Sequence, residues 1–208
     1  AVKYNVYRFV NGVATSVGTD VEGTTYTFTA VEEGQEFVQC AVRPVTTAGE
    51  GNPVLTDMVI AGAPYATPWR ESFVLETMTV FGVDVADNAE WGLVDDTYFG
   101  IASQDGDGVC MSLLGDLGGS STLFSGKIAL GDLQNPGITL YVYNISGEDR
   151  NSVELLVGEV GKALTPLKTF VMHETGGEGW NMISADLSAY AGKVIQLGIK
   201  ASIVNYDF

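Results

Sequence analysis

The eight residues GITLYVYN, Gly137 to Asn144, decide the fold class, because apolar side chains alternate with threonine and tyrosine along them. On an extended chain, successive side chains point to opposite sides. The apolar side consists of Ile138, Leu140 and Val142. The other side consists of Thr139, Tyr141 and Tyr143. This period of two is typical of a β-strand with one face against a core and one face in water.

The same pattern recurs elsewhere in the chain. VIQLGIKA, 194–201, places Ile195, Leu197, Ile199 and Ala201 on one face, and TTYTFTA, 24–30, alternates aromatic residues with threonine. PVLTDMVI, 53–60, predicts one further strand before residue 61. The best helix candidate is SADLSAYAG, where Ser184 could cap a single turn that Gly192 would end. The 26 glycines fall between the apolar runs and indicate turns. The sequence therefore predicts an all-β protein.

Composition limits the function classes. With 208 residues, of which 46% are hydrophobic and 17% charged, the chain can bury a core and form one large or two ordinary domains. Its formal net charge of -16 would repel phosphate backbones and anionic membranes, which excludes nucleic acid as a partner. No apolar window is long enough to cross a bilayer, so we expect no membrane insertion. A surplus of carboxylates favours divalent cations.

A boundary is predicted in AGAPYATPWRESF, Ala61 to Phe73, because Pro64 and Pro68 cannot donate to a strand ladder and favour a stiff, extended linker. The predicted domains are 1–62 and 63–208. Cys40 and Cys110 fall in different domains, so we expect no disulfide between them. The N-terminal AVKYNVYRF lacks the features of a secretory signal.

Before this boundary, the segments YNVYR, followed by NG, and EFVQCAVRPVTTAGEGNP resemble the later half of a fibronectin type III domain. The resemblance implies a partial fibronectin type III-like sandwich whose first two strands have no counterpart here. Such a sandwich would expose a core face and an unpaired edge. We therefore expect the remaining strands to come from flanking residues of a longer parent chain.

After the boundary, residues 63–201 resemble the cleaved-adhesin and MAM-like jelly rolls of secreted surface proteins of Bacteroidetes-type bacteria. The resemblance rests on the order of PWRESF, Trp91, SQDGDG, KIAL, NPGITLYVYN and WNMISADLSAYAGKVIQLGIKA. It implies a β-sandwich jelly roll in a protein that is secreted or held at the cell surface. A further strand normally follows in that family, which is a second reason to expect a fragment.

The loop SQDGDG is either a cation site or a polar turn. It is not an EF-hand, because neither possible frame supplies both the loop oxygens and the closing glutamate, and no helices flank it. Sheet proteins can nevertheless hold Ca²⁺ with loop aspartates and a distant carboxylate. The adhesin resemblance nominates Asp105 and Asp107, with Glu71 as a third ligand, for a structural Ca²⁺. The alternative is a turn that needs aspartate and glycine only for backbone reasons.

Catalytic patterns are absent from the sequence. His173 is the only histidine, and no Gly-x-Ser-x-Gly elbow accompanies it. One histidine and two separated cysteines make zinc improbable, and the phosphate-loop pattern lacks its first glycine. Nothing in the spacing pairs two carboxylates as a glycosidase requires. We therefore expect a protein that is not an enzyme.

The aromatic residues favour a binding function. Tyr141 and Tyr143 share the polar face of their strand, where flat rings could contact a sugar or a protein. The sequence thus predicts a non-catalytic binding or adhesion module that recognises glycan or extracellular protein. Two alternatives stay open, which are a structural spacer and an ancillary domain beside a protease or glycosidase in the parent chain.

Overall fold

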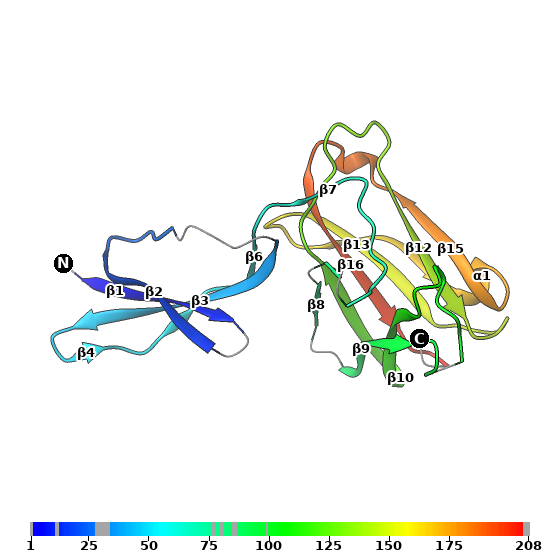
Figure 1. Ribbon diagram of the computed structural model, residues 1–208, viewed down its shortest axis with the longest axis horizontal. Coiled ribbons are helices and arrows are strands. Elements are labelled where there is room, and N and C mark those ends of the chain that lie inside the picture. The colour runs from blue at the N-terminus through cyan, green and yellow to red at the C-terminus, as the bar shows by residue number, and fades with distance from the viewer. Residues whose placement is uncertain are drawn as a thin grey trace. The chain divides into compact units, whose positions relative to one another are not determined.

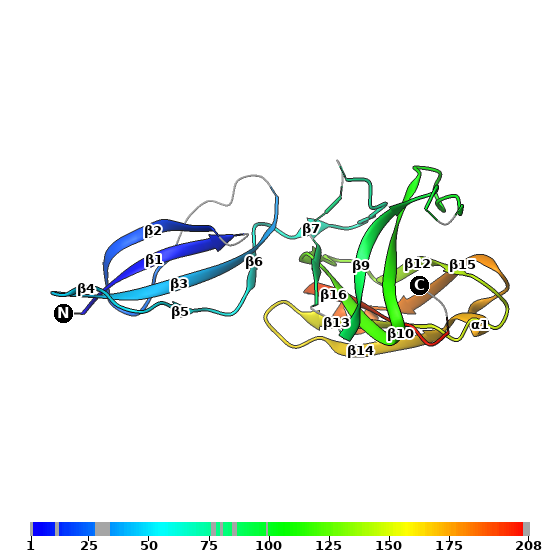
Figure 2. The same cartoon turned by 90° about the horizontal axis from the view of Figure 1, so that it is seen from below.

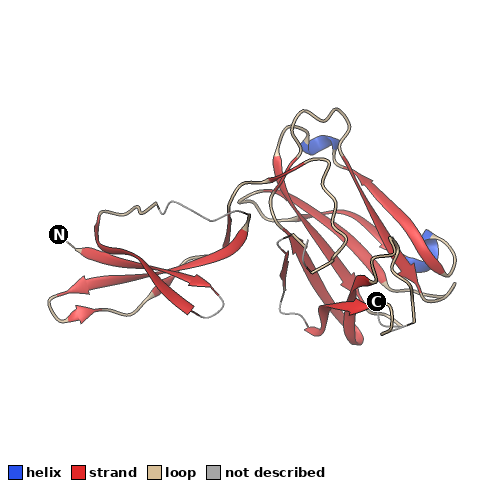
Figure 3. Cartoon of the chain, viewed as in Figure 1, coloured by secondary structure: helices blue, strands red, loops and turns tan. Residues whose placement is uncertain are grey.

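β-strands form nearly all of the regular structure, which confirms the predicted all-β class (Figure 3). The computed structural model describes residues 2–10, 13–27, 34–75, 78–79, 81–84, 87–98 and 100–205. Contacts between Cα atoms divide the chain into two units, Ala1–Ala63 and Pro64–Phe208. Among the described residues, no helix is long and apolar enough to cross a membrane.

Unit 1 is a single six-stranded sheet in its described part (Figure 1). Its antiparallel centre has the order β2-β1-β3, formed by β1 Lys3–Val10, β2 Val13–Glu22 and β3 Glu36–Thr46. Three short strands pair with β3, namely β4 Gly49–Glu50, β5 Val54–Leu55 and β6 Val59–Ala61. The pairing of β1 with β3 follows from the alternation of apolar side chains in both strands. When the two strands pair, Val6 of β1 and Val38 and Cys40 of β3 become buried.

Two expectations for unit 1 need correction. The stretch predicted as one strand from PVLTDMVI forms β5 and β6, because Thr56 lies between them and accepts a hydrogen bond from the Cys40 N–H through its hydroxyl, at 3.0 Å. Residues 24–27 are not in a strand, and residues 28–30 of TTYTFTA lie outside the described residues. The Asn11-Gly12 turn also lies outside them, although Val10 and Val13 on its two sides are paired.

The described residues of unit 2 form two sheets that face each other (Figure 2). The larger has eight strands, with the path β14-β13-β16-β10-β8. These strands are β8 Phe81–Val83, β10 Val109–Ser125, β13 Ser152–Glu159, β14 Thr165–Val171 and β16 Val194–Ser202. Three more join off this path, namely β7 Tyr65–Ala66, β9 Asp87–Asp95 and β11 Ile128–Ala129. The smaller sheet pairs β12 Gly137–Asn144 with β15 Gly179–Asp186.

The core of unit 2 lies between these two sheets. The larger sheet contributes Leu113, Leu155 and Ala201, and the smaller contributes Val142 and Ile183, all to one buried cluster. The predicted apolar face of β12 is therefore the face that meets the core, and unit 2 is a β-sandwich.

The predicted linker is not free over its whole length. Tyr65–Ala66 forms β7, which runs parallel to β11, and the Tyr65 N–H donates to the Lys127 carbonyl at 2.9 Å. Trp69 packs against a second buried cluster of unit 2, which includes Ile128, Leu130 and Ile195. The two prolines do not prevent this pairing, because neither lies in β7.

Two short helical turns complete the part of unit 2 that the structure describes, α1 Met172–Thr175 and η1 Ser188–Tyr190. The single turn predicted in SADLSAYAG is η1, but Ser184 does not cap it, because β15 continues to Asp186. The Asp186 carboxylate accepts hydrogen bonds from the N–H and the hydroxyl of Ser188 instead, and these lower its pKa.

Candidate functional site

The outer face of the β12–β15 sheet carries the two predicted binding tyrosines. Because Ile138, Leu140 and Val142 turn toward the core, Tyr141 and Tyr143 point away from it. The Tyr141 side chain is well exposed, at 49%. Tyr143 is half-buried, because its ring meets Trp180 edge-on with 5.4 Å between ring centroids.

Strand pairing adds two residues that the sequence did not single out for binding. In the register of β12 and β15, Met182 lies opposite Tyr141, and Trp180 lies opposite Tyr143. Residues opposite each other in an antiparallel pair share one face. We call Tyr141, Tyr143, Trp180 and Met182 the aromatic face. Met182 is 60% exposed, so this face presents rings and a thioether directly to solvent.

The loop between β9 and β10 borders the aromatic face. The Trp180 indole N–H donates to the Ala102 carbonyl at 2.8 Å. This bond orients the indole ring and connects it to the SQDGDG loop, which begins at the next residue. The only sequence signal for Trp180 was its place beside a strand-like run, which favoured a core position over this surface.

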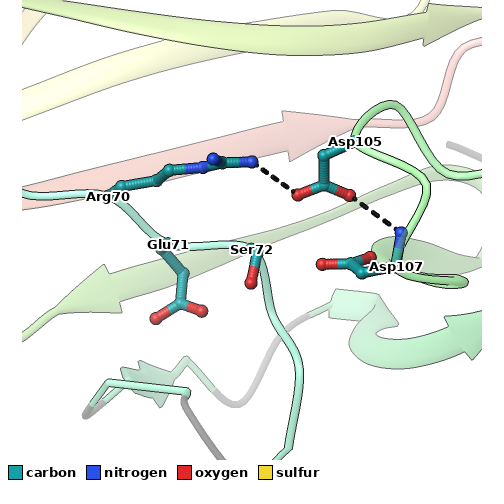
Figure 4. A pocket seen from close by; sticks show the side chains of 5 residues that line it. All are labelled: Arg70, Glu71, Ser72, Asp105 and Asp107. Atoms are coloured by element: carbon teal, nitrogen blue, oxygen red, sulfur yellow. Dashed lines mark hydrogen bonds and ion pairs between the residues drawn. The ribbon is translucent and has the colours of Figure 1, made fainter.

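The three predicted metal ligands line one pocket of about 300 Å³, which we call the acidic pocket (Figure 4). It is formed by Arg70, Glu71, Ser72, Asp105 and Asp107. Arg70 is not among the predicted ligands, and its guanidinium lies 3.0 Å from the Asp105 carboxylate. The Arg70 side chain therefore already places a positive charge among the acidic side chains of this pocket.

Glu71 has a structural partner at each carboxylate oxygen. One oxygen accepts the Phe73 N–H at 2.6 Å, and the other accepts the N–H and hydroxyl of Thr79 at 2.7 and 2.6 Å. Glu71 therefore holds its own segment in place. A metal ion would have to share these oxygens with the segment.

The aspartates of the loop form turn-type contacts. Asp105 and Asp107 each accept a backbone N–H two residues ahead, at 3.5 and 3.4 Å, and the Ser103 hydroxyl accepts the Gly108 N–H at 2.8 Å. Burial acts to raise the pKa of Asp105, but hydrogen bonds involving Asp107 and Arg70 outweigh it, so this pKa is lowered from 3.8. Asp105 is ionised at neutral pH.

These contacts bear on the calcium prediction. Within the described residues, no three histidine, cysteine, aspartate or glutamate side chains are grouped so that they could hold a metal ion. Ca²⁺ in the acidic pocket would need oxygen atoms that now serve Arg70 and the backbone. Calcium binding by Asp105, Asp107 and Glu71 stays a prediction.

The histidine and the cysteines have structural surroundings. His173 lies in α1, where its N–H and its Nδ1 both approach the Asp149 carbonyl, at 2.7 and 3.1 Å. Both cysteines are free, and burial raises both thiol pKa values, with Asp107 and Asp96 raising that of Cys110 further. A thiol with a raised pKa is a poor nucleophile at neutral pH.

Comparison with known proteins gives little. No protein-family model and no curated protein matches the chain. One solved structure that resembles it comes from work on "the promiscuous specificity of the carbohydrate-binding modules from the beta-sandwich super family". The two are 14% identical with a TM-score of 0.48, and the match covers 100% of this chain and 82% of the other. A likeness at this level does not indicate what this chain binds.

Proposed function

We propose that the chain is a non-catalytic module that binds glycan through the aromatic face of unit 2, as part of a secreted or cell-surface protein. The observation that carries the proposal is that Tyr141, Tyr143, Trp180 and Met182 lie together on one solvent-facing sheet surface. A strand face turned to water usually carries polar side chains instead.

The chemistry of this surface suits a sugar ring. Aromatic rings are rigid and offer a large apolar area at little entropic cost, while their edges tolerate polar neighbours. The sheet supplies such neighbours, because Thr139 and Ser184 lie opposite each other on the same face. A pyranose ring could lie on Tyr141 while its hydroxyl groups contact water and these side chains.

Affinity electrophoresis in gels that contain soluble polysaccharide tests the proposal. We expect the unmodified protein to be retarded in at least one polysaccharide gel, and Tyr141→Ala to lose most of that retardation. Leu117→Ala is the control, because Leu117 is 69% exposed on β10 of the larger sheet. Equal retardation of both variants would contradict a role for the aromatic face.

The wider architecture belongs to the same proposal. A fibronectin type III-like unit followed by an adhesin-like jelly roll would suit a surface-exposed multidomain protein, with the missing sandwich strands supplied by flanking residues. Retention on immobilised extracellular protein, without any on glycan, would favour the protein-binding alternative. Failure to bind either would favour the spacer or ancillary-domain alternatives.

Structural Ca²⁺ in the acidic pocket is a separate proposal. A bound ion stabilises the folded state by mass action, so Ca²⁺ should raise the unfolding temperature and a chelator should reverse the rise. Asp107→Asn should abolish the rise, whereas Asp132→Asn, in the exposed turn before β12, should not. A midpoint unchanged by Ca²⁺ would leave the loop as a polar turn.

A further inference from the structure

A groove of about 330 Å³ lies beside the aromatic face, between β14 and β15. β14 is the last strand of the larger sheet, and β15 belongs to the two-stranded sheet, so the groove follows an open side of the sandwich. Lys168 and Phe170 line it from β14, and Met182 and Ser184 line it from β15.

Lys168 spans the groove. Its ammonium donates to the Ser184 carbonyl across the gap at 3.2 Å and lies 4.6 Å from the centre of the Phe170 ring. An ammonium has three N–H donors, and the interactions of Lys168 with described residues include no ion pair. The remaining donors can therefore reach a ligand in the groove.

Met182 joins the groove to the aromatic face. It lies opposite Tyr141 on that face, and it also lines the groove. A ligand that contacts Tyr141 can therefore continue over Met182 to Lys168 without leaving the protein surface. The path from Tyr141 to Lys168 runs from β12 across the whole of β15 to β14. Neighbouring strands in a sheet are about 4.8 Å apart, so one sugar ring cannot cover this path.

Charge restricts the ligand. The chain carries a net charge of -16, and Glu174 lines the same groove as Lys168. A polyanionic chain would meet repulsion along most of this surface, whereas a neutral chain would not. An ammonium can donate to hydroxyl or ring oxygens of an uncharged sugar.

Resting on the glycan-binding function above, we propose that the aromatic face and the groove form one continuous site for a neutral oligosaccharide chain. One part of the chain stacks on the aromatic face, and a later sugar accepts a hydrogen bond from Lys168. Affinity should therefore increase with chain length until both parts are occupied.

The test begins with affinity gels of arabinoxylan, mixed-linkage β-glucan and galactomannan, compared with alginate and polygalacturonate. Oligosaccharides of increasing length from the retained polymer are then titrated by calorimetry. The variant is Lys168→Met, which keeps an unbranched apolar stem against Phe170 and removes the ammonium. The control is Lys162→Met, because Lys162 pairs with Glu159 and does not line the groove.

We expect neutral polymers to be retained and the polyanions not. Lys168→Met should lower the affinity for long oligosaccharides by roughly three- to tenfold, the loss of about one hydrogen bond, and should leave the affinity for the shortest bound oligosaccharide unchanged. Lys162→Met should match the unmodified protein.

The outcomes separate the two proposals. Binding that depends on Tyr141 but not on chain length or Lys168 would overturn the continuous site and leave the proposed function standing. Preference for the polyanions would also overturn it. The absence of binding to any polysaccharide would overturn both proposals.

Discussion

The two units use the same alternating strands but bury them differently. Unit 2 packs two sheets against each other, and both hydrophobic core clusters found among the described residues belong to it. Unit 1 is one sheet in its described part, and several large apolar side chains of its short strands and loops stay more than half exposed. These are Val54, Leu55, Met58 and Val59.

The difference shows what alternation achieves by itself. A strand with one apolar face has a preferred side, but only a second layer removes that side from water. In unit 2 the β12–β15 pair supplies this layer, so its inner face completes the core while its outer face is turned to solvent. Unit 1 has β-strand pairing without comparable burial.

The largest expected effect concerns a core leucine. Leu155 is 1% exposed, so Leu155→Ala should destabilise unit 2 by about 2–5 kcal/mol through lost burial and a cavity. Urea unfolding followed by tryptophan fluorescence measures this, because Trp69, Trp91 and Trp180 all belong to unit 2. Leu55→Ala, at a 52% exposed leucine of unit 1, is the matched control. It should change stability by less than about 0.5 kcal/mol, measured by circular dichroism. Similar losses at both positions would remove the contrast between the units.

A smaller effect is expected for a buried amide. Asn151 is 0% exposed, and its Oδ1 accepts the N–H groups of Val204 and Asn205 at 2.7 and 3.2 Å. Asn151→Ala leaves those donors unpaired and should cost unit 2 about 1–3 kcal/mol in the same urea experiment. In unit 1, the Gln39 side chain donates to the Thr56 carbonyl in an exposed position. Gln39→Ala should cost less, because water can replace the lost partner. An equal cost would mean that burial does not decide the effect.

The smallest effect concerns two solvent-accessible glutamates, one in each unit. Hydrogen bonds from Tyr7 and Asn5 lower the pKa of Glu50, and hydrogen bonds from Lys193 and Lys162 lower the pKa of Glu159. A lowered folded-state pKa adds stability above the ordinary value of 4.5, and this stability is lost as pH falls through the folded value. Glu50→Gln and Glu159→Gln should each slightly lower the unfolding temperature of their own unit at pH 7. At a pH well below the folded-state pKa the carboxylate is protonated, so neither substitution should lower the unfolding temperature there. Thermal unfolding scans of each variant and of the unmodified protein, from pH 7 down to that acidic pH, check whether the loss of stability disappears as pH falls. An effect of equal size at every pH would exclude the carboxylate charge as its cause.

Part of the candidate site could be predicted because it depends on neighbours in the chain. Alternation in GITLYVYN places Tyr141 and Tyr143 on one face whatever β12 pairs with. Trp180 and Met182 could not be assigned to that face, because a shift of one residue in the β12–β15 register would turn them inward. The position of Lys168 near the aromatic face could not be predicted either, since it depends on β14 lying across a groove from β15.

The all-β class, the core face of β12 and β16, and the exposure of Tyr141 follow from the order of residues alone, because side-chain alternation is a local property of an extended chain. Folding is needed to bring Trp180 and Met182 beside the tyrosines, and to bring Arg70 together with Glu71, Asp105 and Asp107 in one pocket. These groupings bring together residues far apart in the chain, and strand register and layer packing fix them.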